Sequence, residues 1–225
     1  MNKLLKICQA IGLISLLISC GGGEFREEPS VVFVEPQPEG EDNLAAFPAR
    51  LKGKYRGMAE NNQLSITDKF IISTSVFEDK IPIAALDSNL RLNGDTITDL
   101  KSGEKTKVIL QGDSIMRSFT FTDTVFRLNY DNVLRKFRGH YFLNTRYEGE
   151  NWDVKQLSPD GSRLIIGSIR SQEDIQNLQS ISEAPADTSS DMPRRFHLSK
   201  KQFRKYLGRE GFRDQSIYIR ESGMR

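Results

Sequence analysis

Short stretches of β-branched and aromatic residues, each ended by a turn signal, follow one another from Phe47 onwards, and this pattern limits the fold more than any other feature. The clearest turn is Asn93-Gly94, because these residue types supply the positive φ angles of a two-residue hairpin loop. Further hairpins are indicated around Gln111-Gly112 and from Ser158 to Ser162. The chain is therefore predicted to be all-β: an antiparallel meander that forms a barrel or two stacked sheets.

Two similar strand openings raise the question of duplication. Lys52-Gly53-Lys54-Tyr55 in the first half resembles Arg138-Gly139-His140-Tyr141 in the second half. Two interpretations stay open: duplicated meanders over residues 47–130 and 134–225, or chance similarity. The opening Gly-x-Tyr followed by hairpins also resembles lipocalin-like barrels. It departs from their Gly-x-Trp and from their disulfides, so the resemblance alone implies no ligand binding.

One or two short helices are predicted in the last third of the chain. Ser171 followed by Asp174, and Ser199 followed by Gln202, each match the signature of a helix start, in which the first side chain caps the first turn. Between these helices, residues 183–193 are rich in Ser, Asp and Pro, which predicts a mobile loop. Closing strands are predicted at residues 194–198 and 216–220.

The first twenty residues have the character of a secretory signal. A basic start with Lys3 and Lys6 precedes an apolar run from Ile7 to Ile18, which is too short to cross the hydrocarbon core of a membrane as a helix. Leu17-Ile18-Ser19-Cys20 resembles the lipobox of bacterial lipoproteins. The resemblance implies cleavage before Cys20 and attachment of a diacylglycerol, usually with a further acyl chain, to that residue.

This resemblance implies a protein of the bacterial cell envelope, anchored by lipidated Cys20, with the outer membrane as the expected location. Cys8, the other cysteine, would leave with the signal peptide (residues 1–19), so the mature chain would hold no disulfide. The alternative is an ordinary signal peptide with an incidental cysteine. Residues 20–46 are rich in Gly, Pro and acidic residues, which predicts a flexible tether, although Val31–Val34 could instead add an edge strand.

Charge is distributed unevenly. Residues 24–42 carry seven carboxylates and one arginine, whereas residues 191–225 carry ten Lys or Arg and four acidic residues. The basic end could be a solvated surface of a packed helix, or it could contact anionic headgroups, a polyanion or an acidic envelope protein. Nucleic acid is not expected as a partner of an exported lipoprotein. The candidate basic docking face consists of Lys200, Lys201, Arg204, Lys205 and Arg209.

The sequence predicts no cofactor and no metal site. The chain has two histidines, His140 and His197, and no cysteine besides Cys20 would remain after processing, so zinc or copper sites built from these residue types are not expected. Gly21–Gly23 belongs to the tether and not to a strand–helix junction, so it is not a phosphate loop. Asp87-Ser88-Asn89 lacks the other ligands of a calcium loop.

No catalytic residue is predicted either. A serine hydrolase of the Gly-x-Ser-x-Gly type is not indicated, because that motif does not occur in the sequence. His140 directly follows a glycine in a predicted strand and is expected to face solvent or to cap a sheet edge. Carboxylate pairs such as Asp95 and Asp99 are common on solvated surfaces, whereas a glycosidase needs its pair across a cleft.

The expected function is therefore non-enzymatic: an envelope lipoprotein whose β-domain binds or scaffolds a partner. The first alternative is a lipocalin-like carrier of a small apolar ligand, and the second is an envelope hydrolase. A filled core with a basic exposed face favours the scaffold, an internal apolar cavity favours the carrier, and two carboxylates that converge in a cleft favour the hydrolase. The carrier cavity would be lined by Phe70, Phe119, Phe121, Phe126 and Tyr141.

Overall fold

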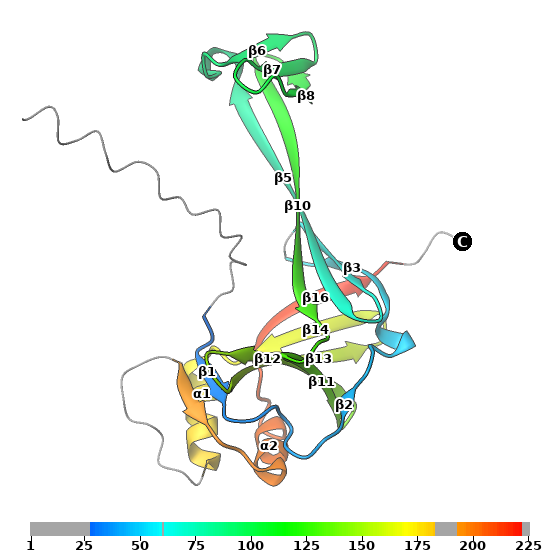
Figure 1. The fold of residues 1–225 in the computed structure, drawn as a ribbon, viewed down its shortest axis with the longest axis vertical. Coiled ribbons are helices and arrows are strands. Elements are labelled where there is room, and N and C mark those ends of the chain that lie inside the picture. The colour runs from blue at the N-terminus through cyan, green and yellow to red at the C-terminus, as the bar shows by residue number, and fades with distance from the viewer. Residues whose placement is uncertain (1–27, 60, 183–192, 222–225) are drawn as a thin grey trace, which may run out of the picture.

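The computed structural model of the chain describes residues 28–59, 61–182 and 193–221. Strands dominate it and form a 13-stranded sheet and a separate three-stranded sheet (Figure 1). The large sheet contains β1 (Val31–Phe33), β2 (Asn43–Leu44), β3 (Gly53–Gly57), β4 (Asn62–Ile66), β5 (Phe70–Pro82), β9 (Ile109–Gln111), β10 (Ser114–Arg127), β11 (Asn132–Phe137), β12 (His140–Tyr147), β13 (Asn151–Asp160), β14 (Arg163–Ser168), β15 (Arg194–Phe196) and β16 (Asp214–Arg220). The small sheet contains β6 (Leu90–Asn93), β7 (Thr96–Asp99) and β8 (Lys105–Lys107), and the helices are α1 (Gln172–Ile181), α2 (Lys200–Leu207) and the short 3-10 turns η1 (Ala49–Leu51) and η2 (Ile83–Ala85).

The large sheet is a bent, open meander. Its strands follow the order β2-β11-β12-β13-β14-β16-β3-β4-β5-β10-β9, and β1 joins at β13 with β15 beside it. Every pair is antiparallel except β1 with β15. The predicted all-β antiparallel fold with short helices near the C-terminus is confirmed. Within the described residues the end strands β2 and β9 do not pair, so the sheet does not close into a barrel and its two halves pack as stacked layers.

The inner face of the bend encloses one core, which we call the inner core. Tyr55 of β3 and Leu64 of β4 meet Leu143 of β12 and Leu164 of β14 there, and all four are buried. Side chains alternate across a strand, so Phe142 points to the opposite face from Leu143. Strand β12 is therefore buried on both sides, which explains its nearly continuous apolar sequence.

The outer face of β12 and β13 carries a second core, which we call the outer core, and the two helices cover it (Figure 1). The rings of Phe142 and Phe203 contact edge to face, with their centroids 5.1 Å apart. Both helices begin where the sequence predicts. The Ser171 side chain accepts a hydrogen bond from the Asp174 backbone N–H, and Ser199 with Gln202 forms a complete capping box.

Strands β5 and β10 leave the body as a long two-stranded ribbon, which we call the arm, with the small sheet at its tip (Figure 1). Ile97, Val108 and Ile115 form the core of that tip. The hairpin predicted here is confirmed as the β6–β7 connection, but its loop lies one residue later than predicted: Asn93 pairs with Thr96, so the two loop residues are Gly94 and Asp95, and Gly94 alone of these has a positive φ, 59°. Strand β5 continues without interruption through the three charged residues Glu78 to Lys80.

The prediction of a flexible tether up to residue 46 is wrong for its folded part. Val31–Phe33 form β1, which is buried and pairs with β13 on one side and, in parallel, with β15 on the other. The segment therefore adds a strand to the sheet, as the alternative expected, but not at its edge. Burying this apolar patch in the outer core outweighs the polar composition around it. Residues 1–19 and Cys20, as well as residues 183–192 of the predicted mobile loop, lie outside the described residues.

The two similar strand openings lie within one sheet. Gly53 begins β3 and Gly139 precedes β12, yet β16 from the second half of the chain pairs with β3 from the first half. The duplicated meanders therefore stay a prediction. No helix in the described part of the chain combines the length and the apolar character needed to span a membrane.

Candidate functional site

A cavity of about 750 Å³ opens on the inner face of the bent sheet, where the arm joins the body. Eight strands contribute to its wall: β4, β5 and β10 on one side, and β11, β12, β13, β14 and β16 on the other. It is continuous with the inner core, because Leu64, Leu143 and Tyr218 belong to both. The cavity is the unfilled end of the space that the core occupies elsewhere.

The inward-facing side chains change from apolar to polar along each strand towards the cavity mouth. Strands β14 and β16 show this most clearly, because inward residues pair directly across them. At the core end, buried Leu164 lies opposite Tyr218. The next inward pair is Ile166 with Ser216, and the pair at the cavity mouth is Ser168 with Asp214. Inward-facing residues are thus apolar at the core end of each strand and hydrogen-bonding at the cavity end.

The opposite wall follows the same order. On β12, buried Leu143 is followed at the next inward position by Thr145, which lies opposite Asp153 of β13. On β4 and β5, Asn62 lies opposite Ser75 at the mouth. Polar groups at inward positions weaken a core unless water or a ligand satisfies them, so this gradient is a feature expected of a binding site.

Charges of both signs line the cavity and balance. The Arg170 guanidinium lies 3.4 Å from the carboxylate of Asp214, and the hydroxyl of Ser168 donates to the same oxygen at 3.2 Å. The Arg127 guanidinium lies over the ring of Phe70, 5.5 Å from its centroid. The charged residues of the lining are three carboxylates and three cations: Asp123, Asp153, Asp214, Arg127, Lys155 and Arg170.

An exposed aromatic face of the arm leads into the cavity. Phe121, which is 60% exposed, lines the mouth, and Phe119, two residues along β10, lies on the same ribbon face opposite Phe77. Arg117 lies on this face too; its guanidinium pairs with Asp79 at 2.8 Å and stands 5.1 Å from the centroid of the Phe119 ring. The arm therefore extends the cavity wall outwards with apolar surface.

The five residues proposed for a carrier cavity fall into three groups. Phe70, Phe121 and Phe126 line the cavity, as expected. Phe119 lies further out on the arm and is 45% exposed. Tyr141 is buried in the inner core, where its hydroxyl accepts a hydrogen bond from Arg50 at 2.9 Å. The sequence therefore located part of the wall but not its polar residues.

The candidate basic face lies on the exposed side of α2, while Phe203 and Tyr206 of the same helix are buried. Lys200 pairs with Glu41 at 2.5 Å, and Arg209 donates to the Ser180 hydroxyl at 2.7 Å. This arrangement fits the alternative of a packed helix with a solvated basic side, and docking through it stays a prediction. Within the described residues, the face members without an ion pair are Lys201, Arg204, Lys205 and Arg209.

Other chemical candidates lie away from the cavity. His140 sits at the start of β12, half-buried, with its Nδ1 2.7 Å from the Ser158 hydroxyl. Neither residue lines the cavity, so their contact does not create a hydrolytic site there. Asp99 at the tip accepts the backbone N–H groups of Lys101 and Ser102, so this carboxylate closes a turn.

His140 provides a test of the structure through pH. Burial, and secondarily the Arg138 guanidinium, lower the pKa of His140 below its usual value. The folded chain therefore binds this proton less readily than the unfolded chain, so the contribution to stability is complete above the ordinary histidine pKa and declines as pH falls through the lowered value. We expect a flatter stability profile between pH 7.5 and pH 5 for His140→Gln than for the native chain in urea unfolding. Parallel profiles would contradict the lowered pKa of this half-buried imidazole.

The polar residues of the cavity could not be predicted from the sequence, because none of them belongs to a recognisable motif. The signal that could have found them is a polar residue at an inward position, such as Ser73 and Ser75 after buried Ile71, or Asp214 and Ser216 before Tyr218. Recognising it requires knowing which face of each strand is inward. Comparison with known proteins adds nothing to this geometry: no protein-family model, no curated protein and no solved structure matches the chain.

Proposed function

We propose that the protein is a lipid-anchored protein of the bacterial cell envelope whose β-domain binds a polar partner in the inner-face cavity without chemical turnover. The observation that carries this proposal is the change from apolar to polar side chains along the inward positions of β4, β12, β14 and β16. A sheet that needed only stability would continue its apolar core to the end of these strands.

The lining favours a ligand that is polar and close to neutral. Hydroxyl and amide side chains such as Ser216, Thr145 and Asn132 offer both donors and acceptors, while three carboxylates and three cations cancel in sum. Phe121 and the aromatic face of the arm supply apolar surface next to these groups. This combination fits an extended polar chain with some apolar surface better than a compact charged ion.

The same lining residues argue against the two alternatives, the carrier of an apolar ligand and the hydrolase. A carrier of an apolar ligand would bury it against Asp153, Lys155 and Arg170, which would lose their water without gaining partners. A hydrolase would use two of the lining carboxylates. In favour of binding alone, Asp214 is already held by the Arg170 guanidinium and the Ser168 hydroxyl.

The anchor would hold the domain close to the membrane. Seven residues, 21–27, separate Cys20 from the first described residue. Even a fully extended segment of this length reaches no more than roughly 28 Å. Because the chain is folded from Ser30 onwards, the tether is shorter than its composition implied, and the partner would be bound within a few tens of ångströms of the bilayer.

A photo-crosslinker in the cavity mouth tests this proposal in intact cells. We expect p-benzoylphenylalanine in place of Phe121 to give a discrete covalent adduct, because this ring lies in the cavity wall. Thr122 is the matched control, since it is also exposed but points to the opposite face of the arm. The adduct mass identifies the partner, and a shortened glycan or peptide among the products would indicate the hydrolase instead. Equal labelling from both positions would contradict the proposed cavity site.

A further inference from the structure

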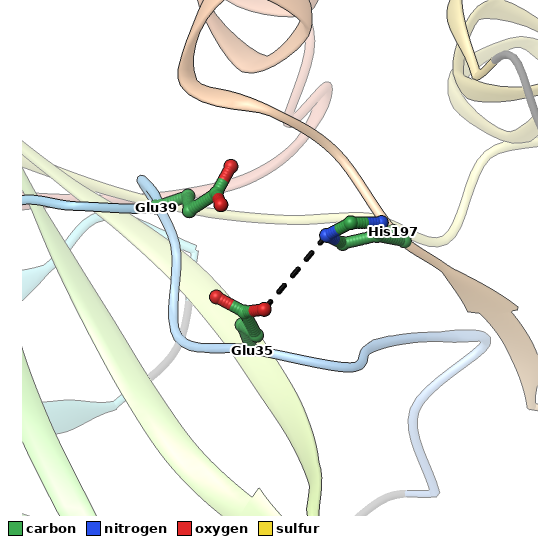
Figure 2. A group of neighbouring side chains, drawn as sticks. All are labelled: Glu35, Glu39 and His197. Carbon is green, nitrogen blue, oxygen red and sulfur yellow. Dashed lines mark ion pairs between the residues drawn. The ribbon is translucent and has the colours of Figure 1, made fainter.

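Three metal-ligating side chains converge on the surface opposite the cavity wall, at the edge of the outer core. Glu35 and Glu39 belong to the segment between β1 and β2, and His197 directly follows β15. One ligand atom from each side chain lies within 4.8 Å of the other two. Figure 2 shows the two carboxylates and the imidazole pointing to a common space from these two segments.

The parallel pairing of β1 with β15 creates this proximity. Phe33 lies opposite Phe196, and the backbone N–H of Val34 donates to the Phe196 carbonyl at 3.0 Å. Both strands end here, and His197 directly follows Phe196 while Glu35 directly follows Val34, so the paired strands bring the backbones of the two residues close together. Their side chains meet with 3.8 Å between Oε1 and Nε2.

The segment that joins Glu35 to Glu39 is fixed by side chains of the body. Asn144, fully buried, accepts the backbone N–H of Gln37 at 2.5 Å and donates to its carbonyl at 2.9 Å. Arg135 donates to the carbonyls of the two flanking prolines, at 2.5 and 2.9 Å. The spacing of the two glutamates is thus set before any ion binds, which reduces the entropy lost on binding.

Charge in this segment is not balanced by the protein. Residues 35–42 contain four carboxylates, and the cations that interact with them among the described residues are Lys200 and Arg135. Two negative charges are left over, and Glu39 is half-buried without an ion pair in the described part of the chain. A divalent cation would neutralise this excess and relieve the repulsion between the two neighbouring carboxylates.

We propose that Glu35, Glu39 and His197 form a binding site for a divalent transition-metal ion of the zinc type, which clips the β1–β2 segment to the segment before α2. Imidazole favours zinc over calcium and magnesium, and carboxylate oxygens complete such sites together with water. Metal–ligand bonds of about 2.1 Å require donor atoms roughly 3.4 Å apart. Small rotations of the exposed Glu35 and His197 side chains bring the present atoms to that separation.

Isothermal titration of the untagged mature chain, solubilised in detergent and stripped with EDTA, tests the site with Zn²⁺ as the probe. We expect saturable binding of a single ion and, with Co²⁺ in its place, visible absorption bands that report nitrogen and oxygen ligands. His197→Ala and Glu39→Gln are each expected to weaken Zn²⁺ binding about tenfold or more. Both side chains are at least partly exposed, so the variants are expected to keep the native unfolding midpoint in the absence of metal.

Two matched controls separate a coordination site from general attraction of cations. Glu41→Gln removes the same charge from the same segment but from a residue engaged by Lys200, and His140→Gln removes the other histidine. Both controls are expected to bind Zn²⁺ as the native chain does, and Ca²⁺ is not expected to compete at equal concentration. The proposal is overturned by absence of saturable binding, by equal effects of Glu41→Gln and Glu39→Gln, or by unchanged binding in His197→Ala. The proposed metal site does not depend on ligand binding in the cavity or on lipidation, so a negative result for either of these leaves the Zn²⁺ test valid.

Discussion

Replacing Asp174 by alanine is expected to lower the free energy of unfolding by about 3–5 kcal/mol, because two buried donors would lose their partner. Its carboxyl group is fully buried and accepts the Tyr206 hydroxyl at 3.1 Å and the Arg213 backbone N–H at 3.0 Å. Burial raises the pKa of Tyr206 far above its usual range, so this hydroxyl keeps its proton and remains a donor. The Tyr206 oxygen in turn accepts the Phe212 N–H at 3.1 Å, so one carboxyl group ties α1 to α2 and to the chain that follows.

Urea unfolding of the protein measures this effect, and the neighbouring residue provides the control. Glu173 occupies the same first turn of α1 and pairs with Arg213 at 2.5 Å, but its side chain is 63% exposed. Glu173→Ala is therefore expected to cost no more than about 1 kcal/mol. Comparable losses for the two variants would show that Asp174 does not hold the helices together.

Replacing Cys20 by alanine is expected to abolish acylation of the protein and its salt-resistant association with the envelope membrane. Each buried methylene of an acyl chain contributes about 0.8 kcal/mol, so two or more chains give stable anchoring. Intact-mass measurement and incorporation of labelled fatty acid are the readouts, because an uncleaved signal could by itself retain the variant at the membrane.

Cys8→Ala is the matched control for lipidation. Cys8 lies inside the predicted signal peptide and would be removed from the mature chain, so its replacement is expected to leave the lipidated product unchanged. A native product that begins elsewhere than at Cys20, or fatty acid retained in Cys20→Ala, would remove the basis for the anchor. The cavity and the cluster of Glu35, Glu39 and His197 would then belong to a protein located elsewhere in the cell.

Local signals predicted much of the fold. The sequence predicts the hairpin at Gly94 with its loop one residue too early, because Gly94 supplies the positive φ while Asn93 still pairs with Thr96. Ser171 and Ser199 specify helix starts by capping their own first turns. The length of the arm is not evident from the sequence, because the charged run Glu78 to Lys80 is untypical of a strand interior. A ribbon exposed on both faces tolerates charge, so β5 continues through them.

Non-local contacts could not be predicted in the same way. Val31–Phe33 lie among acidic residues and prolines, and only pairing with a strand more than 160 residues later makes them core. The distance in sequence between Glu39 and His197 hides their cluster for the same reason. The cavity is formed by eight strands together, so a single polar inward residue such as Ser216 indicates no site until the facing wall is known.

The most direct test of ligand binding in the cavity is to fill the cavity with a large side chain and to measure the yield of the crosslinked adduct from position 121. Ser216 faces inward on β16, whereas its neighbour Gln215 faces the other side of the same strand. With the crosslinker at position 121, Ser216→Trp is predicted to reduce the adduct about tenfold or more, and Gln215→Trp is predicted to leave it unchanged. An adduct of native yield in Ser216→Trp, with the protein folded and in the membrane, would contradict the assignment of this cavity as the binding site.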